Sequence, residues 1–348
     1  MPRYSLRDSA RSARRLSLRY VSTVESGYGR RRCGHGFAFF HPSGRLVSSL
    51  PLRKWLSGLP IPPAWTHVWI CRYRNGHILA TGRDAKSRKV YLYHPEWREH
   101  RSLTNFERLA AFGSALPTIR KRVDQHLRQR GLLRERVVAA AIRLMDCTHI
   151  RVGGDEYARE NRSYGVTTLL DRHMELEGRR LHLSFRAKGG QQREVSLSDR
   201  RLARVLRQCE DLPGQRLFQY VDEDGKRRPI DSDDINAYLH EAAGADLTAK
   251  DFRTWGGTVA ALEFLMQQKP LEEGEDPEPI IKTCLEHAAK HLANTVNIVR
   301  AHYVHPLVLD AFRHGSLPPA PRRKRRTLAP AETVVLKILK RKRRRTSR

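Results

Sequence analysis

The sequence predicts an α+β fold, with a small antiparallel β-sheet domain followed by a larger, mostly α-helical domain. Before about residue 100, apolar and polar residues alternate in short segments, which is typical of strands. After that point, apolar residues recur every three to four positions in longer segments, which is typical of helices. The chain has 348 residues, of which 39% are hydrophobic, and this is enough for two packed domains.

Antiparallel strands account for the first domain. The strongest signal is Asn75-Gly76, a favoured hairpin turn between two apolar segments. In the last expected strand, Val90 and Leu92 face the core, and this places Tyr91 and Tyr93 on the opposite face. The expected strands are residues 36–40, 45–47, 67–73, 77–81 and 88–93, with a rigid proline-rich connector at 60–63.

Helices account for most of the second domain. The apolar positions Leu133, Val137 and Ala141 fall on one helical face, and similar patterns recur down the chain. One hairpin interrupts the helices, with residues 181–185 and 195–197 as its strands and Lys188 at its tip. The expected helices are residues 133–145, 202–209, 232–239, 251–266 and 280–292, with an exposed acidic loop at 270–279.

Positive charge gathers at both ends of the chain. The net charge is +29, of which residues 1–32 carry +7 and residues 321–348 carry +12. We therefore divide the chain into a basic N-terminal arm (1–32), a β-rich domain (33–100), a helical domain (101–315) and a basic C-terminal tail (316–348). Such a charge favours a polyanionic partner, most simply nucleic acid. The Arg- and Ser-rich arm is loosely like a transit peptide, but a nucleic-acid-binding arm or a disordered leader is the favoured interpretation. The tail is either a DNA tether, with a nascent helix between its two basic blocks, or a solvated segment.

Composition excludes several other classes. The chain has no run of about 18 apolar residues, so we expect no membrane-spanning helix. Its five cysteines include no C-x-x-C pair, which argues against a structural zinc site or a disulfide framework and indicates a reducing compartment.

Five residues in the second half could carry chemistry. Arg151 follows an amphipathic helix, Lys188 occupies the hairpin tip, and Arg253 opens a helix in the pattern Lys250-x-x-Arg253. Asn294 lies nine residues before Tyr303. Taken singly, each has an ordinary reading: a surface ion pair, a solvated lysine, a helix cap or a core tyrosine.

Taken in order, these residues resemble the catalytic set of the type IB DNA topoisomerases, in the poxvirus-like branch that is also found in bacteria. Segments elsewhere strengthen the resemblance, which covers about residues 35–312. They are Ile61–Ile70, Ala80–Asp84, Arg88–His94, Glu156–Asn161 and Gly165–Leu169.

The resemblance implies a fold and a reaction. The helical domain would share the fold of the tyrosine recombinases, and the chain would act as a monomer that closes as a clamp around duplex DNA. It would relax supercoils through a 3′-phosphotyrosyl intermediate, strand rotation and religation, without ATP, metal or other cofactor. Its expected place is the cytoplasm, associated with the nucleoid, and it would not be secreted.

The resemblance also implies a role for each residue. Tyr303 matches the nucleophile, Arg151 and Arg253 the pair that holds the phosphate, and Lys188 the general acid. Asn294 stands where viral members carry a histidine that donates a hydrogen bond to a phosphate oxygen, and its amide can also donate. The expected DNA contacts are Tyr91, Tyr93, Tyr157, Arg88 and Lys89.

Two alternatives stay open at this point. A tyrosine recombinase shares the Arg-Lys-Arg-Tyr logic, but recombinases usually have His-x-x-Arg at the second arginine and a helical N-terminal domain. A non-enzymatic basic DNA-binding protein accounts for the charge of +29 but gives no reason for the ordered set of residues.

Overall fold

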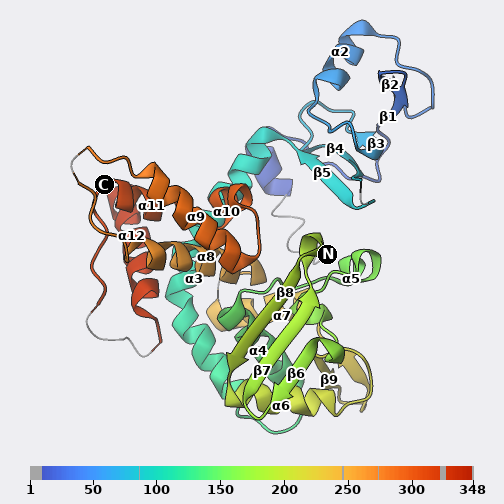
Figure 1. Cartoon of the computed structure of the whole chain (residues 1–348). Coiled ribbons are helices and arrows are strands. Elements are labelled where there is room, and N and C mark those ends of the chain that lie inside the picture. The colour runs from blue at the N-terminus through green and yellow to red at the C-terminus, as the bar shows by residue number, and fades with distance from the viewer. Residues whose placement is uncertain (1–9, 86, 245–246, 273, 322–326, 347–348) are drawn as a thin grey trace. The chain divides into compact units, whose positions relative to one another are not determined.

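A computed structural model describes residues 10–85, 87–244, 247–272, 274–321 and 327–346 (Figure 1). The chain divides into two compact units, Met1–Leu103 and Thr104–Arg348, and the boundary falls within helix α3 (Pro95–His126). Across the described residues, every helix is too short or too polar to pass through a lipid bilayer.

The first unit contains a five-stranded antiparallel sheet in the order β2-β1-β3-β4-β5. Its core includes Leu56, Ile70 and Ala80. The hairpin around Asn75-Gly76 and the strand that follows it are confirmed. The elements are β1 (Tyr28–Cys33), β2 (Gly36–Phe40), α2 (Leu50–Gly58), β3 (Thr66–Ile70), β4 (Ile78–Arg83) and β5 (Lys89–Tyr93).

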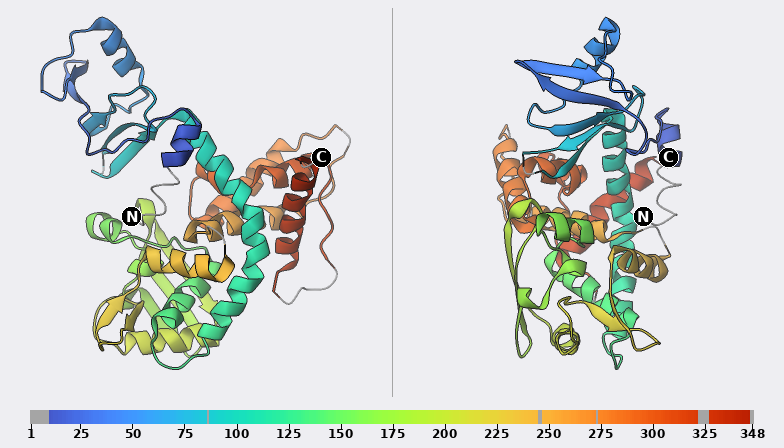
Figure 2. Two further views of the ribbon diagram at one scale, coloured as in Figure 1. Left: turned by 180° about the vertical axis from the view of Figure 1, so that it is seen from behind. Right: turned by 90° about the vertical axis from the view of Figure 1, so that its right-hand side faces the viewer.

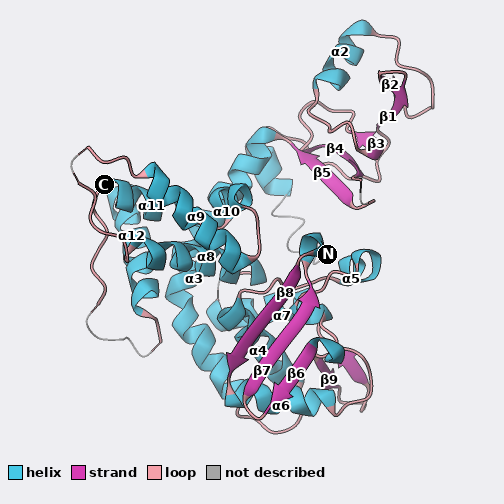
Figure 3. Ribbon diagram, in the orientation of Figure 1, coloured by secondary structure: helices cyan, strands magenta, loops and turns pink. Residues whose placement is uncertain are grey.

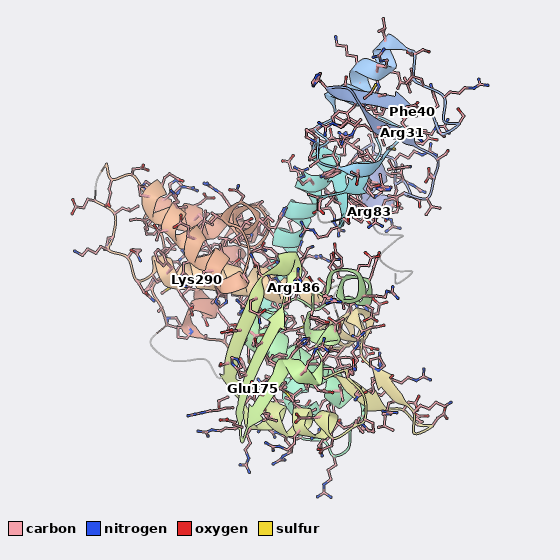
Figure 4. All side chains as sticks on the ribbon, turned by 45° about the vertical axis from the view of Figure 1, so that its right-hand side comes forward. Arg31, Phe40, Arg83, Glu175, Arg186 and Lys290 are labelled. Atoms are coloured by element: carbon pink, nitrogen blue, oxygen red, sulfur yellow. The ribbon has the colours of Figure 1, made fainter. Side chains whose placement is uncertain are left out.

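The predicted start of this sheet was wrong, because the sheet includes strand β1, which was not expected. The expected strand at 45–47 is reduced to a single bridge between Leu46 and Phe40, and β2 pairs with β1 instead. Residues 28–32, expected in the basic arm, thus belong to the sheet. The arginines of β1 are held by the fold: Arg30 donates hydrogen bonds to three carbonyls in and after the proline-rich connector, and the Arg31 guanidinium lies 4.9 Å from the Phe40 ring centre (Figure 4).

The second unit is mostly helical, and the five helices expected from apolar spacing are confirmed within a few residues. They are α4 (Arg134–Thr148), α6 (Arg200–Glu210), α7 (Ser232–Ala243), α8 (Ala249–Leu265) and α9 (Glu278–Leu292). The side chain of Asp199 caps α6 by accepting from the backbone N–H groups of Arg201 and Leu202. Further helices not predicted are α5 (Asp155–Asn161), α10 (Val296–His302) and α11 (Pro306–Arg313). Helix α12 (Pro330–Thr346) lies where the DNA-tether interpretation placed a nascent helix.

A three-stranded sheet, β6 (Met174–Glu177), β7 (Arg180–Arg186) and β8 (Gln192–Ser198), stands among these helices (Figure 3). The expected hairpin is its β7–β8 part, in which Leu183 pairs with Val195. Figure 4 labels Arg186 and Glu175 at opposite ends of the sheet, with Arg186 at the end of the hairpin tip. A small second hairpin joins β9 (Gln219–Val221) and β10 (Arg227–Pro229).

The region expected as a basic tail contains a helix with a buried face. Helix α12 packs against α8 and α11, and its ribbon lies beside the other C-terminal helices in Figure 2. Its apolar side chains belong to the main core of the second unit. The apolar residues of α12 recur at helical spacing, so one face of the helix can be buried. The burial of this face stabilises the helix in the core although basic residues precede and follow the apolar stretch in the sequence. Part of the expected tail is therefore an integral helix of this unit.

Candidate active site

Tyr303 is held closely against helix α8. The Thr258 hydroxyl lies 3.1 Å from the Tyr303 carbonyl oxygen and accepts a hydrogen bond from the His305 backbone N–H. Gly257 allows this approach, because a Cβ there would lie 3.0 Å from the Tyr303 carbonyl and 2.8 Å from the Leu292 side chain. The backbone of the candidate nucleophile is thus fixed by its contacts with one helix.

Arg253 projects from the same helix toward the tyrosine. Its guanidinium carbon lies 5.1 Å from the centre of the Tyr303 ring. The guanidinium donates to the backbone carbonyls of His149 and Leu292, the latter at 2.8 Å. Its Nε is buried and has no hydrogen-bond partner within the described part of the chain. Two bonds therefore orient this side chain while one buried donor stays available for an anion.

Three arginines share one recess beside the tyrosine. Arg151, Arg193 and Arg253 line it, and no carboxylate lines it within the described residues. Burial, together with the charge of Arg151, lowers the pKa of Arg253 to about 10. Burial also lowers the pKa of Arg151 and of Arg193. Positive charge that is desolvated and lacks a countercharge favours an anionic ligand such as a phosphate.

Arg193 was missed at the sequence level. It lies on β8 and donates to the carbonyls of Thr148 at 3.3 Å and His291 at 3.0 Å. Its position two residues before Val195 and four before Leu197 places it on the inward face of the strand, where the pattern is otherwise apolar. An arginine on that face was the signal that could have identified it.

Two histidines whose backbone carbonyls accept from Arg253 and Arg193 also contact each other. The Nε2 of His291 and the Nδ1 of His149 are 2.9 Å apart. Burial, followed by the charge of His291, lowers the pKa of His149 to about 3, so this ring is neutral at physiological pH. The His149 ring packs on α8 at Gly256, where a Cβ would overlap it. The pair thereby supports the backbone carbonyl that accepts from Arg253.

Lys188 and Asn294 do not line the arginine recess. Lys188 is exposed at the hairpin tip, where its Nζ lies 5.2 Å from the ring centre of Tyr157 on α5. Asn294 is half-buried, and its side-chain oxygen accepts from the Thr295 backbone N–H at 3.2 Å. The residue that lines the recess at this point is its neighbour Ala293.

The expected DNA contacts of the first unit lie on β5 and just before it. The Tyr91 and Tyr93 rings stack with centres 5.8 Å apart, and both side chains are exposed. Lys89 Nζ lies 5.6 Å from the Tyr91 ring centre. The Arg88 charge is compensated by Asp84, whose carboxylate accepts from its Nε at 2.7 Å. The stacked tyrosines and Lys89 therefore form a flat aromatic surface with one adjacent cation.

Comparisons with known proteins identify the family of the chain. Residues 94–309 match the family of the eukaryotic DNA topoisomerase I catalytic core, and residues 36–84 match the N-terminal domain of bacterial DNA topoisomerase IB. A DNA topoisomerase 1B of Acanthamoeba polyphaga mimivirus is 28% identical over 297 residues, which cover 83% of this chain and 88% of that protein. The chain therefore belongs to the type IB DNA topoisomerases, in the branch that contains the poxvirus-like and bacterial enzymes.

Proposed function

We propose that this topoisomerase cuts one DNA strand with Tyr303, remains attached to the 3′-phosphate, lets the free strand rotate and then reseals the break. The observation that carries the proposal is the Arg253 guanidinium over the Tyr303 ring, in a recess shared with Arg151 and Arg193 and lined by no carboxylate in the described chain. A phosphate bound beside the Arg253 guanidinium would meet the Tyr303 nucleophile, and Arg151 and Arg193 would place two further cations close by.

The residue types fit this reaction. A phenol has a pKa of about 10, so it is a weak nucleophile but an acceptable leaving group when the 5′-hydroxyl attacks to reseal the strand. The pentacovalent transition state carries extra negative charge on its nonbridging oxygens, and the guanidinium groups of Arg151 and Arg253 would stabilise it. Arg193 adds a third cation on the β8 side. Because the phosphodiester energy is kept in the phosphotyrosyl bond, the reaction requires neither ATP nor a metal ion.

Lys188 and Asn294 complete the proposed set. Lys188 would protonate the departing 5′-oxygen, and its exposed position on a hairpin tip allows it to approach DNA bound at the recess. Asn294 would donate a hydrogen bond from its amide to a phosphate oxygen, and its own oxygen is already engaged with Thr295.

DNA would contact both units of a monomeric clamp. Each unit presents an exposed tyrosine beside a lysine: Tyr91 beside Lys89 in the first, and Tyr157 beside Lys188 in the second. Aromatic faces and cations suit the sugars and phosphates of a backbone. Tyr93 and Arg88 extend the first contact, and the proposed place of action is nucleoid DNA in the cytoplasm.

A plasmid relaxation assay tests the function. The wild-type chain should relax both negatively and positively supercoiled plasmid in EDTA without ATP. Tyr303→Phe should bind duplex DNA with unchanged affinity but form no covalent adduct, because only the phenolic oxygen is removed. Tyr220→Phe, at a half-buried tyrosine on β9, is the matched control and should behave as wild type. A requirement for ATP or metal, or an SDS-stable adduct in Tyr303→Phe, would overturn the mechanism.

A further inference from the structure

Helix α12 lies outside the residues that match the catalytic-core family, which end at 309. It nevertheless packs in the same hydrophobic core, where Val334, Val335 and Leu339 are buried. The core of this unit therefore includes an element beyond the matched residues, and the contacts of that element lead to helix α8, which carries Arg253.

Glu332 is the polar centre of the α12 contact. Its side chain is only 6% exposed. One carboxylate oxygen accepts from the Trp255 indole N–H at 3.0 Å and from Arg120 at 2.8 Å. The other oxygen accepts from Arg120 at 2.9 Å and from the Ala329 backbone N–H at 2.7 Å. Burial raises the pKa of the Glu332 carboxyl, but its hydrogen bonds, led by those from Arg120, outweigh that effect and hold the pKa below its usual value.

Arg120 connects α12 to two other helices. It lies on α3, and on its far side it forms a two-point ion pair with Asp146 of α4, at 2.8 and 2.9 Å. It also donates to the Thr327 carbonyl at 2.8 Å. Arg120, which is itself held by Asp146, therefore fixes the position of the Glu332 carboxylate. This position allows the carboxylate to accept from the Trp255 indole N–H.

Trp255 lies on the side of α8 that faces away from the active site. It follows Arg253 by two residues, which places it about 200° around the helix. Gly256 and Gly257, on the Arg253 side, face His149 and Tyr303. The Trp255 ring is 2% exposed and packs on Gly113 of α3, where a Cβ would overlap it. The indole is therefore held by its ring on one helix and by its N–H on another.

We propose that Glu332 is a positioning residue for catalysis: by holding the Trp255 indole it fixes the rotation of α8 about its axis, and so the place of the Arg253 guanidinium above Tyr303. This inference rests on the proposed function of those two residues. A rotation of about 10° moves a group about 6 Å from a helix axis by about 1 Å, and a displacement of that size can cost on the order of 100-fold in rate.

Single-turnover cleavage of a duplex that traps the covalent adduct tests the proposal, at a temperature at which every variant is folded. Glu332→Gln should slow cleavage by about 10- to 100-fold and leave the duplex Kd within about twofold of wild type. Trp255→Phe, which keeps a packed ring but removes the N–H, should slow it in the same way. Val335→Ala is the matched control: it lies in the buried face of α12 and should lower Tm while leaving the cleavage rate unchanged.

A double-mutant cycle separates positioning from stability. In an Arg253→Ala background, Glu332→Gln should cause no further loss of cleavage rate, since the group it positions is absent. An equal loss in both backgrounds, or an unchanged rate for Glu332→Gln and Trp255→Phe, would overturn the proposal. Either result would leave the proposed function intact, because that function is overturned only if wild type forms no adduct or Tyr303→Phe still forms one.

Discussion

Close to Tyr303, arginine side chains are buried without a carboxylate beside them among the residues that the structure describes. Arg193 illustrates the consequence, because its guanidinium is fixed by two carbonyls and the charged residues described around the recess are all cations. We expect Arg193→Ala to slow single-turnover cleavage by about 10- to 100-fold with little change in duplex Kd, since the charge acts mainly on the transition state. Arg180→Ala, exposed at the far end of β7, removes the same charge and should leave the rate unchanged. Equal effects of the two variants would show that Arg193 contributes only bulk charge.

Lys188 allows a test of proton transfer. Lys188→Ala should slow cleavage of ordinary DNA severely, because the 5′-oxygen then leaves without a proton. On DNA with sulfur at the 5′-bridging position the defect should be much smaller, because a thiolate leaves without protonation. The measurement is the ratio of the two single-turnover rates in wild type and variant. An equal defect on both substrates would remove Lys188 from the role of general acid.

His149 makes stability depend on pH. Burial lowers the pKa of its ring to about 3, so between about pH 6.5 and 3 the unfolded chain binds a proton that the folded chain does not. The free energy of unfolding should therefore fall as the pH drops below about 6.5. His149→Asn removes the titrating ring, and asparagine tolerates the left-handed backbone conformation at φ 54°. The Tm of this variant should therefore fall less steeply over the same pH range. Parallel Tm curves for the two proteins would contradict the prediction.

Among the elements, helix α12 allows the clearest prediction, which concerns its deletion. A chain ending at Ala320 lacks its buried side chains, and each larger one contributes about 1.5–3 kcal/mol by burial. The sum is comparable to the whole stability of about 5–15 kcal/mol of a typical protein. We therefore expect this truncation to abolish cooperative thermal unfolding, whereas a chain ending at Lys340 keeps the buried face and should retain its transition. A wild-type melting curve for the Ala320 truncation would show that α12 does not belong to the core.

The same elements show what could be predicted from the sequence. Helices α4 and α6–α9 and the hairpin at Asn75-Gly76 have a clear apolar period or a turn signal, and these were predicted. Strand β1 was missed because Arg30, Arg31 and Arg32 interrupt its alternation, and the burial of Arg30 depends on carbonyls more than 30 residues away. At the site, residue order identified the candidates, but the long-range contacts of Arg193 and Glu332 are set by tertiary structure.

For the whole molecule, net charge governs binding. The chain carries +29, and residues 341–348 hold six of its lysines and arginines. Each phosphate neutralised on duplex DNA contributes about 0.9 to the slope of log K against log salt, so removal of these residues should reduce the slope by up to about 5. The single-turnover cleavage rate at saturating enzyme should not change, since the proposed catalytic groups are all retained. An unchanged salt slope would show that this segment does not bind DNA.

The hydrogen bond from Trp255 of α8 to Glu332 also matters while the chain is being synthesised. A ribosome releases the chain from its N-terminus, so Tyr303 emerges 29 residues before Glu332. A nascent chain that already displays the nucleophile still lacks the carboxylate that holds Trp255. Competence to break DNA would then arise only after α12 has left the ribosome and docked, so that incompletely translated molecules near the genome would be poor nicking agents.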